Sequence, residues 1–409
     1  MRQSLTVALC LCFLGLAARP AAAQVPPDQL AKPWTTAQIT FGPIYLAPTF
    51  ELKDVGIDNN VLNDEVNPKS DLTGTLAMRT LAGIHLGGDR LVFQVQQNNA
   101  YIWYRRYRSE RSIDGTLNFV LELRTAMFRP WVRWDKTKSS QRQGYEIDER
   151  AERKTPTFDF GLDFTAPFRI GASATMRRAR LRFADTEEYD GTNLSEALDS
   201  NSDAYTGFLR YAFSEYTDFI VGVDYSRDRF TKSPLRDNDS ENYYAGVSIK
   251  TGTVFTGSAT VGFRNQSHLV STVPNYRGLT ANVGMGILPN EFFRFEVNAT
   301  RDMQYTYQEL YPFMIEEGAS ASMTNRFAEH FDAVYSARWR RLSYNETING
   351  LTSPHSDRTV VLGLGAGYYV GGGSGTRLGL LFEHTQRVSP IAGRSFTNNR
   401  ISSNYRFSF

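Results

Sequence analysis

The chain has 409 residues, of which 41% are hydrophobic and 13% aromatic, and its 45 Lys and Arg stand against 43 Asp and Glu. This near balance of charge excludes a general electrostatic attraction to nucleic acid, so we expect no nucleic-acid partner. Both cysteines, Cys10 and Cys12, lie in the apolar N-terminal segment, which excludes disulfides and cysteine-ligated metals from the rest of the chain.

Residues 1–23 have the pattern of a secretory signal peptide. Arg2 precedes an apolar run of 13 residues from Leu5 to Ala17, and small residues follow up to Ala23. A run of this length is too short to cross a bilayer as a helix. We therefore expect Sec-type export with cleavage near Ala23, and then a short periplasmic segment over residues 24–42.

From residue 43 to residue 409 the sequence alternates between apolar and polar residues, as a strand with one apolar face does. For example, Phe158, Phe160 and Leu162 fall on one face, whereas Asp159 and Asp163 fall on the other. After residue 23 there is no apolar run of roughly 18 residues, so spanning helices are excluded. A membrane protein of this kind must be a closed barrel, because a bilayer tolerates no unpaired strand edge.

Short and long connections alternate between the predicted strands. We expect short turns at residues 87–89, 125–127, 166–167, 214–217, 251–253, 288–290, 325–326 and 371–375. Longer polar stretches cover residues 54–70, 105–111, 138–154, 185–202, 231–240, 265–276, 304–312, 344–356 and 388–395. Short periplasmic turns and long extracellular loops are typical of outer-membrane barrels, and this layout predicts an antiparallel, up-and-down transmembrane barrel of about 18 strands, within 16 to 20.

The chain ends in a strongly amphipathic strand. Tyr405, Phe407 and Phe409 alternate with polar residues up to the last position. We interpret these aromatics as the C-terminal signal that the barrel-assembly machinery reads. A soluble β-sandwich is the alternative, but the polar residues that interrupt the apolar faces fall near loop ends, as lipid contact requires. They are Arg178, Arg227, Arg301, Glu317 and His384.

The polar faces of the predicted strands carry bases and acids in equal numbers. Of the thirteen bases and thirteen acids on these faces, those singled out as lining the lumen are Arg79, Arg124, Arg133, Asp135, Asp159, Asp163, Arg169, Asp224, Arg264, Arg294, Glu296, Arg338 and Glu383. This balance indicates a weakly selective pore. The other interpretation is that neighbouring charges only neutralise one another along the wall.

The loops hold acidic clusters at residues 58–65, 146–149 and 187–190, and a basic cluster at residues 105–111. Carboxylates can bind divalent cations, but none of these clusters has calcium-loop spacing, so we interpret them as solvated charge and expect no metal and no cofactor. The basic cluster is a candidate contact for lipopolysaccharide phosphates. His384 is the candidate base for a hydrolase at the rim, but no nucleophile is identifiable, so we expect no catalytic residues and no enzyme activity.

The stretch from Phe41 to Val61 resembles the opening of the putative β-barrel porin 2 family. The matching positions are Gly42, Pro43, Pro48, Gly56, Asp58, Asn60 and Val61, and residues 101–104 and 109–111 also resemble the family. The resemblance implies an outer-membrane barrel, and for some members a link to exopolysaccharide production. It supplies no catalytic residues.

Two functional hypotheses follow. In the first, the protein is a porin-like barrel in the outer membrane of a Gram-negative bacterium, serving as a passive conduit for small solutes or a component of exopolysaccharide export. In the second, it is a non-conducting structural or adhesion barrel whose loops bind a surface partner. An infolded loop, 138–154 or 185–202, would then close the lumen. The expected partners are outer-membrane lipid, lipopolysaccharide, the barrel-assembly machinery and polysaccharide-export components.

Overall fold

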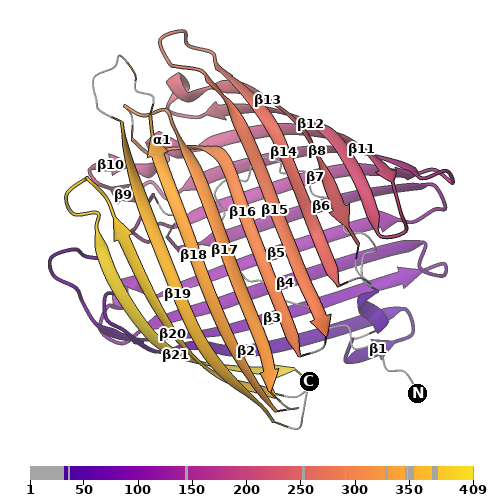
Figure 1. Ribbon diagram of the computed structural model, residues 1–409, viewed down its shortest axis with the longest axis horizontal. Coiled ribbons are helices and arrows are strands. Elements are labelled where there is room, and N and C mark those ends of the chain that lie inside the picture. Colours follow the sequence, from indigo (N-terminus) through magenta and orange to yellow (C-terminus); the bar gives the residue numbers. More distant parts are fainter. Residues whose placement is uncertain are drawn as a thin grey trace.

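The computed structural model describes residues 32–35, 37–142, 146–250, 254–290, 292–308, 310–327, 330–345, 348, 354–370 and 376–408. These residues form one closed antiparallel barrel of 18 strands, in which every strand pairs with its neighbour in the sequence (Figure 1). The strands run obliquely to the barrel axis, and the long connections gather at one end (Figure 1). The predicted signal peptide lies outside the described residues.

The first half of the barrel contains nine strands. They are β2 (Ile44–Asp58), β3 (Asp71–Leu86), β4 (Leu91–Tyr104), β5 (Ser112–Leu123), β6 (Phe128–Ser139), β7 (Arg153–Thr165), β8 (Ile170–Phe183), β11 (Ser200–Ala212) and β12 (Thr217–Phe230).

The second half continues from the edge of β12. Its strands are β13 (Asn238–Ile249), β14 (Phe255–His268), β15 (Tyr276–Asn290), β16 (Phe293–Tyr305), β17 (Phe313–Phe327), β18 (Phe331–Tyr344), β19 (His355–Val370), β20 (Thr376–Val388) and β21 (Phe396–Ser408).

Pairing between the first and last strands closes the barrel. β2 pairs with β21 from Asp58 opposite Arg400 to Thr49 opposite Ser408, with a bulge between Leu52 and Val55. The remaining edge of β2 pairs with β1 (Ile39–Phe41), which the turn at Gly42, with φ +57°, folds back. β1 therefore extends the seam beyond the end of β21 and leaves less of the β2 edge unpaired.

Small elements outside the barrel wall lie in the connections. They are the 3₁₀ turns η1 (Pro33–Thr35), η2 (Arg108–Glu110) and η3 (Pro234–Arg236), the short strands β9 (Glu188–Tyr189) and β10 (Thr192–Asn193), and the helix α1 (Leu194–Leu198). No helix in the described part of the chain is long and apolar enough to cross a membrane.

The predicted strand number and the alternation of short and long connections are confirmed. Two turns lie slightly later than predicted, because β15 extends to Asn290 and β17 to Phe327. The predicted turns at 251–253 and 371–375 lie outside the described residues, although the strands that flank them pair with each other. Successive left-handed residues Gly87, Gly88 and Asp89 form the tight turn between β3 and β4.

The apolar face of the wall points outwards and the charged face points inwards. On β7, Phe158 and Phe160 are 45% and 47% exposed, whereas Asp159 between them is fully buried. A soluble protein would bury the phenylalanines, since each offers about 1.5–3 kcal/mol on burial. This reversed arrangement agrees with a wall that contacts lipid and disagrees with the soluble sandwich.

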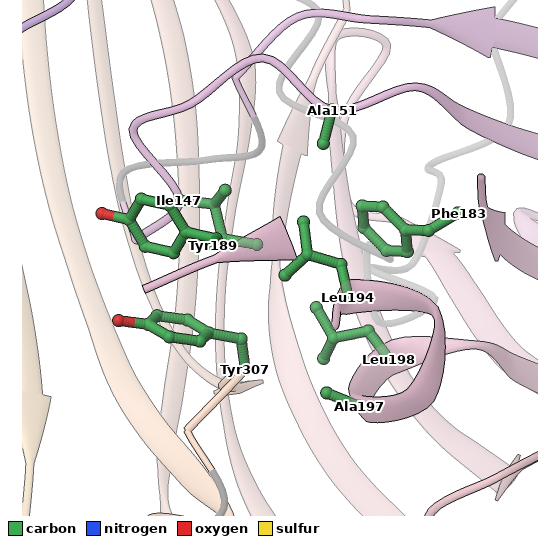
Figure 2. Packing of buried hydrophobic residues seen from close by; sticks show 8 residues of the cluster. All are labelled: Ile147, Ala151, Phe183, Tyr189, Leu194, Ala197, Leu198 and Tyr307. Atoms are coloured by element: carbon green, nitrogen blue, oxygen red, sulfur yellow. The ribbon is translucent and has the colours of Figure 1, made fainter. Parts of the chain in front are cut away.

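The largest cluster of buried apolar residues lies among the long connections rather than in the wall. It joins residues of the 140–152, 184–199 and 306–312 connections, with Phe183 at the end of β8 (Figure 2). Leu194 and Leu198 of α1 and Tyr189 of β9 face Ile147 and Tyr307 in this cluster (Figure 2). A core therefore forms at the end of the barrel where the site described next is found.

Candidate functional site at the mouth of the barrel

Between β6 and β7, the described residues 140–142 and 146–152 reach across the mouth of the barrel, and we call them the crossing loop. Its described contacts include the β2–β3 connection, the β16–β17 connection and strands β18 and β20. Strands spaced about 4.8 Å apart and tilted by about 40° give such a barrel a width of about 35 Å. Side chains on opposite walls cannot bridge this width, so the loop itself must enter the mouth.

Hydrogen bonds hold both sides of the crossing loop. Arg142 donates from Nη2 to the carbonyl oxygen of Val61 at 2.6 Å. Glu146 accepts hydrogen bonds from the Tyr344 hydroxyl at 3.2 Å and from the backbone N–H of Tyr307 at 3.3 Å. Arg394 donates to the backbone carbonyl of Glu146 at 2.9 Å. The loop is thereby tied to strands on the far side of the barrel.

A buried charge cluster holds the next residues of the loop. Arg387 of β20 is 1% exposed and forms ion pairs with Asp148 of the crossing loop and, at 2.5 Å, with Asp357 of β19. Arg394 lies 3.3 Å from the same Asp357 carboxylate. Two guanidinium groups therefore share two carboxylates, and the loop supplies one of those carboxylates. Removal of Arg387 would leave Asp148 without this ion pair and Asp357 with Arg394 alone.

Burial also shifts the pKa values of ionisable side chains in the crossing loop. The pKa of Glu146 is raised from its ordinary value of 4.5 to about 7, because the desolvation of its charged form outweighs the hydrogen bonds and the nearby Arg394. Burial likewise raises the pKa of Asp148 and lowers the pKa of Arg142. Glu146 can therefore change its charge near neutral pH.

The apolar cluster also packs the loops against one another. Ile147 packs with Tyr189 and Leu194 of the 184–199 connection and with Tyr307 of the 306–312 connection. The Tyr189 and Tyr307 rings meet edge to face, with centroids 4.9 Å apart. Asn193 caps α1 by accepting from the N–H of Glu196 at 3.1 Å. These contacts join two neighbouring long connections, 140–152 and 184–199, to the 306–312 connection from the other side of the rim.

A cavity of about 250 Å³ lies beside this cluster. The 184–199, 306–312 and 389–395 connections supply its walls, through Asp190, Thr192, Tyr307, Gln308, Leu310 and Ile391. Two polar groups of the walls bond to each other, since the Tyr307 hydroxyl donates to Asp190 at 3.3 Å. The cavity is thus a recess among the loops that cover the mouth.

Below the loops, the predicted charges of β6 and β7 form one connected group on the inward face. Arg177 donates from Nε and Nη2 to Asp159 at 2.8 and 2.9 Å. Arg133 lies 3.9 Å from the same carboxylate and over the ring of Trp131. Asn118 of β5 donates to Asp135. The fully buried Asp159 is therefore compensated by two bases of the wall.

Three further predicted residues also bond to neighbouring strands. Asp163 accepts from Arg129 at 3.0 Å and from Ser173 at 2.7 Å. Asp224 accepts from Thr206 at 2.9 Å and from Asn242 at 3.2 Å. Arg264 donates to Ser240 at 3.1 Å and to Asp302 at 3.0 Å.

Hydrogen bonds within one strand or between neighbouring strands hold most of the other predicted wall residues. Arg294 bonds to Glu296 at 2.7 Å, and Glu383 accepts from Arg400 at 2.5 Å. Arg79 donates to Gln96 at 3.3 Å. Arg338 stands opposite Ser320, on the inward face of β18. Arg124 follows β5, bonds to Glu122 at 3.1 Å and lies over Trp34, at the end with the short turns.

One predicted lumen residue is placed elsewhere. Arg169 is exposed in the turn between β7 and β8, with φ +62°, and not on a strand. The alternation of β7 does not extend through the turn, which is why the sequence pattern misplaced it. Among the C-terminal aromatics, Tyr405 pairs with Leu52 and Phe407 with Phe50, whereas Phe409 lies outside the described residues.

The acidic clusters at residues 58–65 and 146–149 are not simply solvated, which corrects the prediction for them, whereas Glu188 and Asp190 of the third cluster are exposed. Glu146 is 4% exposed and Asp148 belongs to the Arg387 ion pair. Asp58 accepts from Asn398 at 2.8 Å. Arg387, Arg394 and Asp357 are further residues of the site, and no sequence pattern singles them out. The unusual density of charge at residues 146–149 was the available signal for the site.

The candidate rim histidine has an asparagine beside it, as an orienting group would be, but hydrolysis also needs a serine nucleophile. His384 Nδ1 lies 2.7 Å from Asn399 Oδ1, and within the described ranges no serine is recorded in hydrogen-bond contact with it. No group of three or more His, Cys, Asp or Glu among the described residues is arranged to hold a metal ion.

Comparisons with known proteins identify the fold. The family model described as Putative beta-barrel porin 2 matches residues 32–409. A BenF-like porin from Pseudomonas fluorescens Pf-5 aligns with a TM-score of 0.53 at 12% identity, over 90% of this chain and 99% of that one. OccK2 (OpdF) of Pseudomonas aeruginosa, solved in complex with glucuronate, aligns with a TM-score of 0.51 at 12% identity, over 89% and 98%. No curated protein matches the chain.

Proposed function

Because the chain belongs to the Putative beta-barrel porin 2 family and has the fold of outer-membrane porins, we propose that it is a passive conduit for small polar solutes across the outer membrane. The family and the fold are the main support for this proposal, whereas the crossing loop, anchored by Glu146 and Arg387 to the opposite wall, is the infolded loop that the non-conducting alternative also requires. It narrows one mouth of a wide barrel, as a conduit that discriminates by size requires. We also propose that the long connections of the barrel face the cell exterior.

The wall supports weak charge selectivity. Asp159 is bonded to Arg177, Arg294 to Glu296, and Arg264 to Asp302, so the inward bases and acids largely neutralise one another. An ion passing along such a wall meets local dipoles rather than a field of one sign. We therefore expect a reversal potential close to zero in a salt gradient.

The position of the crossing loop favours small solutes over an extended polysaccharide. Its anchors join opposite sides of the mouth, so a polymer would have to displace the loop to pass. A role in exopolysaccharide export is the second candidate. It would require the ion pairs of Arg387 and Arg394 to open during transport.

Conductance in planar bilayers tests the proposal. The purified barrel is expected to give discrete ionic currents that small sugars and organic acids such as glucuronate reduce only slightly. A barrel that inserts but stays silent at all voltages would overturn the proposal and favour the structural or adhesion alternative. Currents that are blocked by long oligosaccharides, and not by monosaccharides, would favour polysaccharide export.

A further inference from the structure

The outward face of β6, β7 and β8 carries a patch of positive charge close to the long connections. We call it the basic patch; its members are Lys136, Lys138, Lys154, Arg178, Arg180 and Arg182. Lys138 stands directly opposite Lys154, and Lys154 directly opposite Arg182. Like charges at such positions repel one another, so this row destabilises the sheet unless an anion lies beside it.

Carboxylates of the chain compensate the basic patch only in part. Glu152 lies 2.8 Å from Lys138 and 3.3 Å from Lys154, and Asp203 pairs with Arg178 at 2.6 Å. Arg182 donates instead to neutral oxygens of Ser200 and Asn201, both at 2.7 Å. Two carboxylates therefore serve six bases, and the patch has an excess of positive charge.

Several other outward bases near the long connections have an acid directly beside them on a neighbouring strand. Arg229 of β12 pairs with Asp239 of β13 at 2.6 Å, and Arg301 of β16 pairs with Glu317 of β17. The row of Lys138, Lys154 and Arg182 has no such acid on β7, because the outward positions of β7 hold Lys154, Pro156 and Phe158. The excess charge on β6 to β8 extends over three adjacent strands, whereas the facing arginines Arg341 and Arg358 have Glu317 opposite Arg341.

Large aromatic residues lie directly below the basic patch. Phe158 stands opposite Trp134 on one side and Arg178 on the other, and both Phe158 and the next outward residue, Phe160, are about half exposed. Cations and lipid-facing rings are therefore adjacent along the same strands. A ligand that fits must carry phosphate at one end and acyl chains at the other.

We propose that the basic patch binds the phosphorylated sugar headgroup of lipopolysaccharide, with the acyl chains against Phe158 and Phe160. Phosphate oxygens accept charge-assisted hydrogen bonds from lysine and arginine, and a bisphosphorylated headgroup would relieve the repulsion between Lys154 and Arg182. The inference rests on the outer-membrane orientation proposed above, since lipopolysaccharide occupies the outer leaflet. It does not depend on conduction.

Native mass spectrometry of the purified mature barrel in detergent provides the test. The probes are bisphosphorylated lipid A and the same lipid after removal of both phosphates. We expect the wild type to bind the phosphorylated lipid about tenfold more tightly than the variant K138Q/K154Q/R182Q, because each base near an anionic lipid surface contributes to binding. Both proteins should bind the dephosphorylated lipid equally weakly.

A matched control removes the same charge elsewhere on the outward face. The variant R227Q/R229Q/R301Q loses three outward arginines from β12 and β16, which have Asp239 or Glu317 beside them, and should keep the wild-type affinity. Equal losses in the two triple variants, or none in the patch variant, would overturn the proposal. If the patch variant fails to fold, the single change Arg180→Gln, at an exposed side chain, should still weaken binding about twofold. A normal conductance in all variants would leave the conduit proposal standing.

Discussion

Tyr344 of β18 donates a hydrogen bond of 3.2 Å to Glu146 of the crossing loop, although 198 residues separate the two in the sequence. The bond connects opposite sides of the barrel mouth, and both side chains are almost fully buried. Burial in this position raises the pKa of the Glu146 carboxyl, so the docked loop binds a proton more readily than the undocked loop does. The docking of the crossing loop over the mouth of the barrel should therefore depend on pH.

The first prediction is that the crossing loop docks less firmly as the pH rises. The ordinary pKa of Glu146, 4.5, applies to the undocked loop, and the raised value of about 7 applies to the docked loop. The docked state thus holds an extra proton between these values, so docking is fully favoured below about pH 4.5 and weakens up to about pH 7, by about 3 kcal/mol in all. Single-channel recordings should show longer open times at pH 8 than at pH 5.

Two substitutions separate this effect from a general response to pH. Glu146→Gln keeps a group that can accept from Tyr344 but cannot ionise, so its open times should not change between pH 5 and pH 8. Glu152→Gln in the same loop is the control, because the lysine-bound Glu152 has a lowered pKa and stays charged over this range. An unchanged pH response in the Glu146 variant would contradict the assignment.

The second prediction concerns Arg387. Replacing it with Gln leaves Asp148 and Asp357 without their shared partner, and breaking such a buried pair costs about 3–5 kcal/mol. The crossing loop should then leave the mouth, and the mean conductance should rise. Arg406→Gln is the control, since Arg406 pairs with Glu51 near the end of the barrel with short turns. Equal conductance in the two variants would show that Arg387 does not hold the loop.

The third prediction tests the apolar cluster. Ile147→Ala removes a side chain that is 1% exposed, and truncations of this kind cost about 2–5 kcal/mol. The loss should loosen the 140–152 and 184–199 connections together, because Ile147 packs against both Tyr189 and Leu194. Limited proteolysis should cut both connections faster than in the wild type, while the heat-modified mobility of the barrel stays unchanged. Val66→Ala, at a side chain 87% exposed, should leave both cleavage rates unaltered.

The sequence predicts the barrel well because its strands are specified locally. Each strand needs one apolar and one polar face, and this requirement produces the alternation seen at residues 158–164. The turns follow from the same pattern, since alternation stops where pairing stops. Arg169 shows the limit of the argument, because continued alternation places it on the wall when a left-handed turn has already begun.

No local sequence pattern predicts the side-chain contacts at the mouth of the barrel. Nothing near Glu146 in the sequence indicates that Tyr344 and Arg394 will surround it, so its cluster resembles any solvated acidic loop. The two loops named as candidates for infolding do meet over the mouth, but their shared partner Tyr307 comes from a third connection. Such long-range contacts depend on barrel closure, which brings β18 to β20 opposite β6.

The last prediction distinguishes the two faces of the wall. Phe160 faces outwards near the middle of β7, so Phe160→Arg places a charge in the hydrocarbon and should destabilise the barrel by about 2–4 kcal/mol. Asn298→Arg, at an exposed position on the inward face of β16, should cost much less because its side chain meets water. Reversible unfolding in urea with lipid vesicles measures both free energies. A larger cost for the inward substitution would mean that the lipid-facing side has been wrongly assigned, since a charge in water carries no comparable desolvation penalty.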